Sequence, residues 1–141
     1  MPYRFLEEIA IADVAFEAEG QTLNELFEAA AFALTEVMVD LEGLRPIVER
    51  RIHLTAEDLE TLFFRWLAEL IYVKDSECLL FRRFEIRIQK EGQPELQATL
   101  WGDQIDYRKM SLKVDVKAVT YHLFTLEPTP KGWRARVVLD I

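Results

Sequence analysis

The chain has 141 residues; half are apolar, 30% are charged, and the net charge is -8. These values exclude a disordered tail and predict one domain, residues 1–141, while no apolar run reaches the ~18 residues needed to span a membrane. Binding to nucleic acid depends on Lys and Arg that neutralise phosphates, so the acidic balance argues against RNA or DNA as a direct ligand.

The first strong pattern along the chain is a strand followed by a helix. Residues 12–20 alternate apolar and mostly polar side chains, which predicts a half-buried strand whose inward residues are Val14, Phe16 and Ala18. Thr22 and Glu25 then form a T-x-x-E capping box and predict a helix near residues 22–40. Its apolar face is defined by the spacing of Leu23, Leu26, Phe27, Ala30, Leu34, Val37, Met38 and Leu41.

A second strand and helix repeat this order. Residues 50–56 predict the strand, and Thr55 and Asp58 are candidate caps of a helix near residues 56–73. The apolar stripe of this helix contains Leu59, Leu62, Phe63, Trp66, Leu67, Leu70 and Ile71. Phe64 and Ala68 widen the stripe, which indicates burial on two sides.

The single cysteine, Cys78, excludes an internal disulfide and favours a reducing compartment. We expect it to be a small buried residue, since no neighbour in the sequence would activate a thiol. The N-terminal residues lack the basic and apolar regions of a signal peptide. Together these features predict a cytoplasmic protein.

The last part of the chain predicts four strands, in residues 81–92, 95–102, 111–127 and 133–141. The third strand would point Leu112, Val114, Val116 and Ala118 inward. Strands of this kind after two capped helices favour an α+β fold. We therefore expect two amphipathic helices packed against mainly antiparallel strands.

The sequence lacks the common catalytic motifs. It contains no Gly-rich phosphate loop, no CxxC pair and no HExxH, and its two histidines, His53 and His122, are too few for a zinc site built on histidine alone. We expect His53 to be structural or solvent-facing. His122 has the same interpretation with less support, because it lies where a strand meets an aromatic segment.

Two carboxylates lie among apolar neighbours. Asp13 precedes Val14, and Asp140 lies between Leu139 and Ile141. If the first and last strands are neighbours, Asp13, Asp140 and the carboxylate of Ile141 would converge, and such a cluster favours a hard divalent cation such as Ca²⁺. The alternative is that Asp13 caps a turn and Asp140 is an exposed residue of a frayed end.

Several stretches resemble the archease family over nearly the whole chain: ADVAFEAEG with TLNELFEAAAFAL, DLETLFFRWLAELIYVKDSECLLF, KAVTYH and GWRARVVLDI. The resemblance implies an α+β fold related to a domain of the Hsp33 chaperone. It also implies a metal site, usually with calcium, formed by residues that match Asp13, Asp140 and the carboxylate of Ile141. The family usually has a His-Thr pair before the first of these aspartates, where this chain has Ala10 and Ile11.

The functional implication of the resemblance is a non-catalytic accessory protein of the tRNA-splicing RNA ligase. That ligase joins RNA ends with a 2′,3′-cyclic phosphate or 3′-phosphate to a 5′-hydroxyl end through a guanylyl-histidine intermediate. The accessory protein promotes guanylylation and multiple turnover, can broaden the nucleotides used, and meets tRNA only through the ligase. Two alternatives are a chaperone-like partner of tRNA-modifying enzymes and a small metal-dependent hydrolase, the latter needing an open coordination position and a general base.

Overall fold

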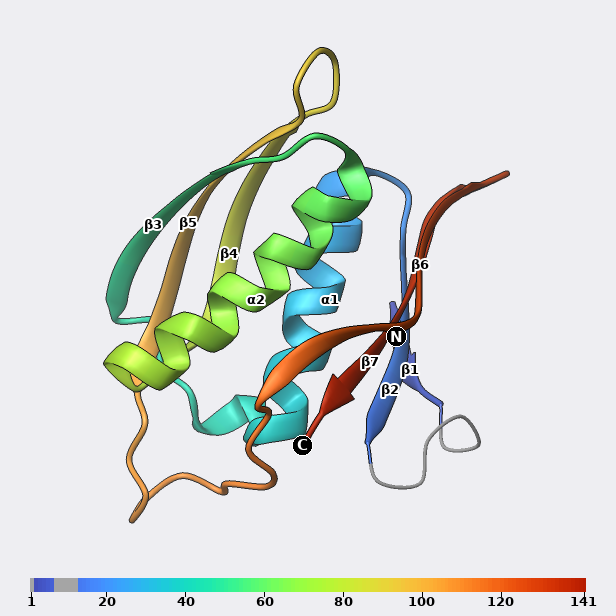
Figure 1. Ribbon diagram of the computed structural model, residues 1–141. Helices are drawn as coiled ribbons and strands as arrows, with labels where there is room; N and C mark the ends of the chain where they lie inside the picture. Colours follow the sequence, from blue (N-terminus) through green and yellow to red (C-terminus); the bar gives the residue numbers. More distant parts are fainter. Residues whose placement is uncertain (1, 7–12) are drawn as a thin grey trace.

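The computed structural model describes residues 2–6 and 13–141 and confirms the α+β class (Figure 1). In these residues two helices and a short 3-10 helix alternate with seven strands. The elements in chain order are β1 (Tyr3–Phe5), β2 (Val14–Gly20), α1 (Leu23–Met38), η1 (Leu41–Gly43), β3 (Val48–Thr55), α2 (Leu59–Glu77), β4 (Leu79–Gln89), β5 (Glu95–Gln104), β6 (Ala118–Thr129) and β7 (Gly132–Asp140).

Both helices begin at the caps that the sequence indicates. The Thr22 hydroxyl accepts a hydrogen bond from the N–H of Glu25 at 3.1 Å, and the Glu25 carboxylate accepts one from the N–H of Gln21 at 2.8 Å. Asp58 caps α2 by accepting from the N–H of Thr61 at 2.7 Å. These side chains satisfy backbone donors that have no partner within the helix, so they fix where each helix starts.

The strands form two antiparallel sheets. One has the order β1-β2-β7-β6 and the other β3-β5-β4. Strand β1 was not predicted from the sequence, and its three residues are too short for a clear alternation. Helix α1 contacts β1, β2, β7 and β4, whereas α2 contacts β6 and all three strands of the smaller sheet. Each helix therefore packs against both sheets.

One continuous apolar core joins these layers. The fully buried residues come from both sheets and both helices and include Phe16, Phe27, Phe63, Trp66, Leu100 and Leu139. The Trp66 indole N–H donates to the backbone carbonyl of Phe27 at 3.0 Å, which satisfies the one polar atom of this side chain and ties α2 to α1. The burial of α2 on two sides, inferred from its wide apolar stripe, is confirmed.

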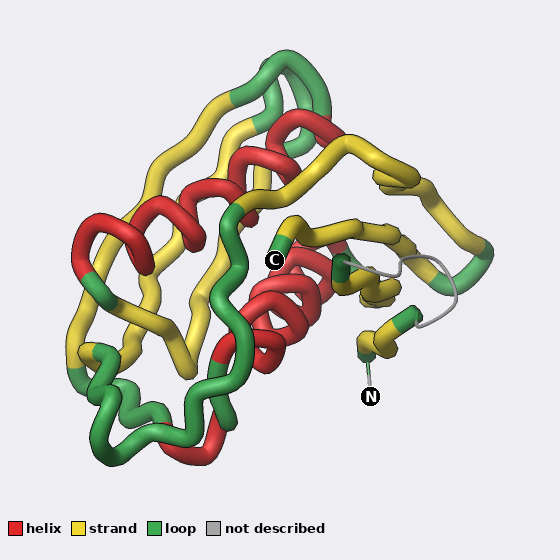
Figure 2. The backbone as a smooth tube through the Cα atoms, turned by 60° about the horizontal axis from the view of Figure 1, so that its bottom comes forward, coloured by secondary structure: helices red, strands yellow, loops and turns green. Residues whose placement is uncertain are grey.

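The expected strand over residues 111–127 is wrong in its first part. Strand β6 begins only at Ala118, and residues 105–117 form a long connection, one of the green segments in Figure 2, between the two sheets. Within it Leu112 and Val114 are 37% and 42% exposed, whereas Val116 is fully buried. The segment runs along the C-terminal ends of the two helices and bonds to them instead of to a partner strand. Its alternation of apolar residues therefore does not reflect a strand.

The expected burial of Cys78 is also wrong. Cys78 is exposed and follows the last turn of α2 in the left-handed conformation, with φ of 56°. Its N–H donates to the carbonyl of Lys74 at 3.0 Å. The residue therefore ends a helix, a position that glycine or asparagine usually takes.

Candidate functional site

The structure brings Asp13 and Asp140 to the same end of one strand pair. Strands β2 and β7 are antiparallel, and their register pairs Val14 with Leu139. Asp13 directly precedes Val14 and Asp140 directly follows Leu139, so the same register extended by one residue would set the two aspartates opposite each other. Successive side chains of a strand point to opposite faces, so the two carboxylates belong to the face opposite the partly buried Val14 and the buried Leu139.

On that same face, the residues of β2 and β7 nearest these carboxylates are buried from solvent. Ala15 and Val138 oppose each other one step before the aspartates, and Leu6 packs on them in a small buried cluster. On the other side of β7, the carbonyl of Asp140 accepts a hydrogen bond from the N–H of Lys117 at 2.8 Å. The backbone at Asp140 is thus fixed by β6 while its side chain is exposed.

The charges of Asp13 and Asp140 are uncompensated within the part of the chain that the structure describes. No Lys, Arg or His there forms an ion pair with either carboxylate. By contrast, Glu17 on the same face of β2 lies 3.4 Å from Arg4 and 3.7 Å from Arg136. Like charges opposite each other on a sheet are destabilising, so this end of the sheet favours a cation.

The donor set at this end fits a hard cation. Residues 2–6 and 13–141 contain no group of three Asp, Glu, His or Cys side chains arranged for a metal. Two aspartate side chains and the carboxylate of Ile141 would supply only oxygen atoms, which are the ligands that Ca²⁺ and Mg²⁺ take. The positions Ala10 and Ile11, which replace the family's His-Thr pair, lie outside the described residues.

A large bulge in β6, the strand next to β7, contains His122. Thr120 pairs with Val138 and Thr125 with Arg136, so residues 121–124 together oppose Val137 alone. Leu123 adopts a left-handed backbone with φ of 53°, and His122 is exposed. The sequence pattern gave no sign of this bulge.

The bulge also exposes apolar side chains. Tyr121 is 67% exposed and stacks on Phe64 of α2 with ring centroids 3.9 Å apart, while Leu123 is 44% exposed. Phe124 packs edge-on against Phe64 from below the same stack. The bulge therefore joins α2 to the strand pair that ends at Asp140.

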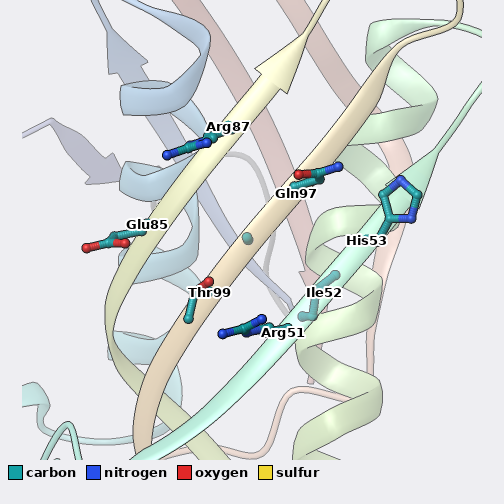
Figure 3. Close-up of a pocket in the computed structure, with 8 residues that line it drawn as sticks. Arg51, Ile52, His53, Glu85, Arg87, Gln97 and Thr99 are labelled. Atoms are coloured by element: carbon teal, nitrogen blue, oxygen red, sulfur yellow. The ribbon is translucent and has the colours of Figure 1, made fainter.

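A hollow of about 450 Å³ lies on the outer face of the three-stranded sheet, away from the two aspartates. Figure 3 shows Arg51, Ile52, His53, Glu85, Arg87, Gln97 and Thr99 around it. Two close pairs of ionisable groups lie on this face: the His53 imidazole is 3.3 Å from the Glu95 carboxylate, and the Arg83 guanidinium is 3.1 Å from the Glu85 carboxylate. His53 is thus solvent-facing, as expected, and its neighbours include no Ser, Cys or Thr aligned as a nucleophile with it.

Neither helix of the described residues combines the length and the apolar character needed to cross a membrane.

The fold and the site define a class: a small α+β protein of two sheets with acidic groups at the end of a central strand pair.

Comparison with known proteins identifies the family within that class. Residues 3–141 match the Archease protein family (MTH1598/TM1083). The chain is 37% identical over 141 residues to protein archease of Archaeoglobus fulgidus, covering all of both chains, and 41% identical over 132 residues to that of Pyrococcus furiosus, covering 92% of this chain and 93% of the relative. The chain therefore belongs to the archease family.

Solved structures agree with the fold. The solution structure of Methanobacterium thermoautotrophicum protein 1598 superimposes with a TM-score of 0.87 at 35% identity, covering 99% of each chain. The crystal structure of an archease, described as a possible chaperone, from Thermotoga maritima gives a TM-score of 0.62 at 26% identity, covering 94% of this chain and 93% of that one. The two-sheet arrangement is thus shared with solved members of the family.

Proposed function

We propose that this protein is a non-catalytic activator of the tRNA-splicing RNA ligase that promotes its guanylylation and multiple turnover. The observation that carries the proposal is the pairing of Val14 with Leu139, each next to an aspartate, in a chain that matches the archease family over residues 3–141. The role itself is the one that the family resemblance implies. Broadened nucleotide use by the ligase belongs to the same proposal.

The proposed cofactor is a divalent cation, Ca²⁺ being the best match to the donors. Asp13, Asp140 and the carboxylate of Ile141 would hold it, and when bound it would neutralise the repulsion between these groups. Asp140 is the last residue of β7, which lies between β2 and β6, while Asp13 and Ile141 directly adjoin β2 and β7, so the proposed donors lie at the ends of packed strands.

The partner in this proposal is the ligase protein, and tRNA is reached only through it. A net charge of -8 offers phosphates no attractive field, whereas it suits a basic protein surface. The exposed Tyr121 and Leu123 lie on the strand that flanks the carboxylates and provide apolar area of the kind found at protein interfaces.

The test is transfer of GMP from labelled GTP onto the ligase's histidine, with and without this protein, under single- and multiple-turnover conditions. We expect faster guanylylation and little effect on a ligase that already carries GMP. Asp13→Ala and Asp140→Ala should each reduce the stimulation, while Glu85→Ala, an exposed carboxylate on the other sheet, should not. No acceleration by the native chain with adequate divalent metal would contradict the proposal.

His122→Ala is a useful further variant in the same assay. His122 is exposed in the β6 bulge and belongs to the KAVTYH stretch that matches the family. A loss of stimulation without loss of Ca²⁺ affinity would separate contact with the ligase from cation binding. Equal stimulation by native and variant chains would remove His122 from the functional surface.

A second candidate function is that of a chaperone-like partner of tRNA-modifying enzymes. It is favoured by the description of the Thermotoga maritima relative as a possible chaperone and by the exposed apolar side chains of the bulge. The two functions differ in stoichiometry. Stimulation at substoichiometric protein supports the activator, whereas rescue of an aggregating client only at equimolar protein supports the chaperone.

A further inference from the structure

Lys74 is the one lysine buried in the core layer of the described residues. It lies in the last turn of α2 and is only 7% exposed. Its ammonium group donates to the Asp115 carboxylate at 2.6 Å and to the backbone carbonyl of Val116 at 2.9 Å, and it lies 2.6 Å from the Asp75 carboxylate. A buried lysine is costly unless it is paired in this way, so its contacts need an explanation.

Two of these three partners belong to the connection between the sheets. Asp115 and Val116 directly precede Lys117, which is the last residue of the 105–117 segment before β6 begins at Ala118. Other backbone hydrogen bonds attach the same segment to the end of α1: the N–H of Lys113 donates to Met38 at 2.9 Å, and that of Asp40 donates to Ser111 at 3.0 Å. Lys74 supplies the side-chain anchor at the segment's C-terminal end.

The next residue after this anchor contacts the candidate site. The N–H of Lys117 donates to the carbonyl of Asp140 at 2.8 Å, and Ala118 then pairs with Asp140 in the β6–β7 ladder. A continuous path therefore runs from the Lys74 ammonium through Val116 and Lys117 to the backbone of Asp140. Apart from the Lys74 side chain, every group on this path belongs to the backbone.

We propose that Lys74 is a positioning residue, which holds residues 115–117 so that the Lys117 N–H fixes Asp140 beside Asp13. This inference deepens the proposed function and rests on it only for the role of the carboxylates. Lys74 touches neither carboxylate of the site and acts through the backbone. Burial opposes the charged form of Lys74, but its bonds to Asp115 and Asp75 outweigh this and raise its pKa, so the anchor is charged at neutral pH.

The structure offers a matched pair of variants for the test. Asp115 and Asp75 both lie 2.6 Å from the same ammonium group, and both side chains are largely exposed, at 70% and 56%. Asp115 belongs to the connection, whereas Asp75 is the next residue of α2 itself. Asp115→Ala and Asp75→Ala thus remove the same charge from the same lysine, but only the first releases the connection.

The first measurement is amide hydrogen exchange at Lys117, with Leu100 in the central strand of the other sheet as an internal reference. We expect Asp115→Ala and Lys74→Met to speed exchange at Lys117 roughly tenfold or more relative to Leu100, through local opening, and Asp75→Ala to change the ratio by less than about threefold. Methionine keeps the unbranched stem of lysine, so Lys74→Met tests the ammonium with little change in packing. Equal exchange at Lys117 in the two aspartate variants would overturn the assignment.

The second measurement is Ca²⁺ binding by calorimetry with the same proteins. Asp115→Ala should weaken binding about fivefold to tenfold, as changes next to metal ligands commonly do, and Asp75→Ala should not. Faster hydrogen exchange at Lys117 in Asp115→Ala with unchanged Ca²⁺ affinity would overturn the positioning role. If the native chain binds no Ca²⁺, the proposed cation site fails, while exchange at Lys117 still decides whether Lys74 holds Asp140.

Discussion

The outer face of the three-stranded sheet and the end of the β2–β7 pair differ in how their charges are arranged. On the outer face of the three-stranded sheet, Arg83 lies 3.1 Å from Glu85 on the same strand, and His53 lies 3.3 Å from Glu95 of the neighbouring strand. At the end of the β2–β7 pair, Asp13 and Asp140 adjoin the paired residues Val14 and Leu139, and neither carboxylate forms an ion pair within the described residues. Compensated charges are typical of a solvated surface, whereas like charges that reduce stability indicate a site kept for function.

The difference is confined to the surface, because both sheets share one core. Leu100 of the three-stranded sheet and Leu139 of the four-stranded sheet are both fully buried in the same apolar cluster. The comparison therefore concerns function and local electrostatics, and it predicts equal responses to damage in the core.

The largest expected effect is the loss of stability on truncating either leucine. Leu100→Ala and Leu139→Ala should each lower the free energy of unfolding by about 2–5 kcal/mol, because a buried leucine leaves a cavity that packing only partly closes. Urea unfolding followed by fluorescence and by circular dichroism measures this. Two separate transitions, one for each sheet, would contradict a shared core.

The next effect is that of Asp13→Asn on the free energy of unfolding, which should change sign when Ca²⁺ is added. With a chelator present, Asp13→Asn should raise the free energy of unfolding by about 0.2–1 kcal/mol, since it removes one of two like charges. With Ca²⁺ at about 100 times its dissociation constant the native chain should instead gain roughly 2.7 kcal/mol that the variant largely lacks. Thermal unfolding under both conditions tests this. If Asp13→Asn is more stable than the native chain both with chelator and with Ca²⁺, the result argues against a cation at the site.

A smaller effect concerns acid stability in the three-stranded sheet. Asp103 is buried on β5, and hydrogen bonds from the Arg45 guanidinium, at 2.9 Å for its Nε, hold the pKa of Asp103 below its ordinary value although burial opposes this. A lowered pKa in the folded state contributes stability that is complete above the unfolded pKa and is lost as the pH falls through the folded one. Stability measured from about pH 6 to about pH 2.5 should therefore fall more steeply for the native chain than for Asp103→Asn.

The smallest effect is expected on the compensated face. Glu85→Gln breaks an exposed pair with Arg83 and should change the free energy of unfolding by less than about 1 kcal/mol, because solvent screens such pairs. The same variant should leave Ca²⁺ affinity unaltered. A Ca²⁺ effect as large as that of Asp13→Asn would mean that overall charge, and not the β2–β7 site, governs binding.

The helices and most strands could be predicted because their signals are local. Thr22 and Asp58 cap helices whose apolar periodicity continues for several turns, and β7 shows a clear alternation up to Leu139. The pairing of β2 with β7, on which the position of Asp13 depends, followed from the family resemblance and the shared apolar setting of the two aspartates. Sequence spacing alone favoured the alternative in which Asp13 caps a turn and Asp140 lies in a frayed end.

The connection over residues 105–117 could not be predicted from spacing. Leu112, Val114 and Val116 alternate like strand residues, but alternation does not reveal whether a partner strand is present. Here the available partners are the ends of α1 and α2, so only Val116 is buried. The relevant signal was Lys74, which occupies a position on the apolar stripe of α2, four residues after Leu70, where a solvated lysine is not expected.

The β6 bulge and its left-handed Leu123 also had no sequence signal. Left-handed positions usually carry glycine or asparagine, and a leucine there is set by tertiary packing around it. The stacking of Tyr121 on Phe64 joins residues 57 positions apart, which no local pattern reports. Long-range contacts of this kind decide how His122 is presented.

The central claim is that the carboxylates at the end of the β2–β7 pair bind a divalent cation. The most direct measurement is Ca²⁺ titration by calorimetry of the native chain and of a chain extended by a single glycine after Ile141. The extension keeps every side chain but turns the Ile141 carboxylate into a neutral peptide carbonyl. The account predicts Ca²⁺ binding by the native chain and affinity at least about tenfold weaker in the extended chain, the scale expected when a metal site is damaged. Equal affinity in the two chains would contradict it.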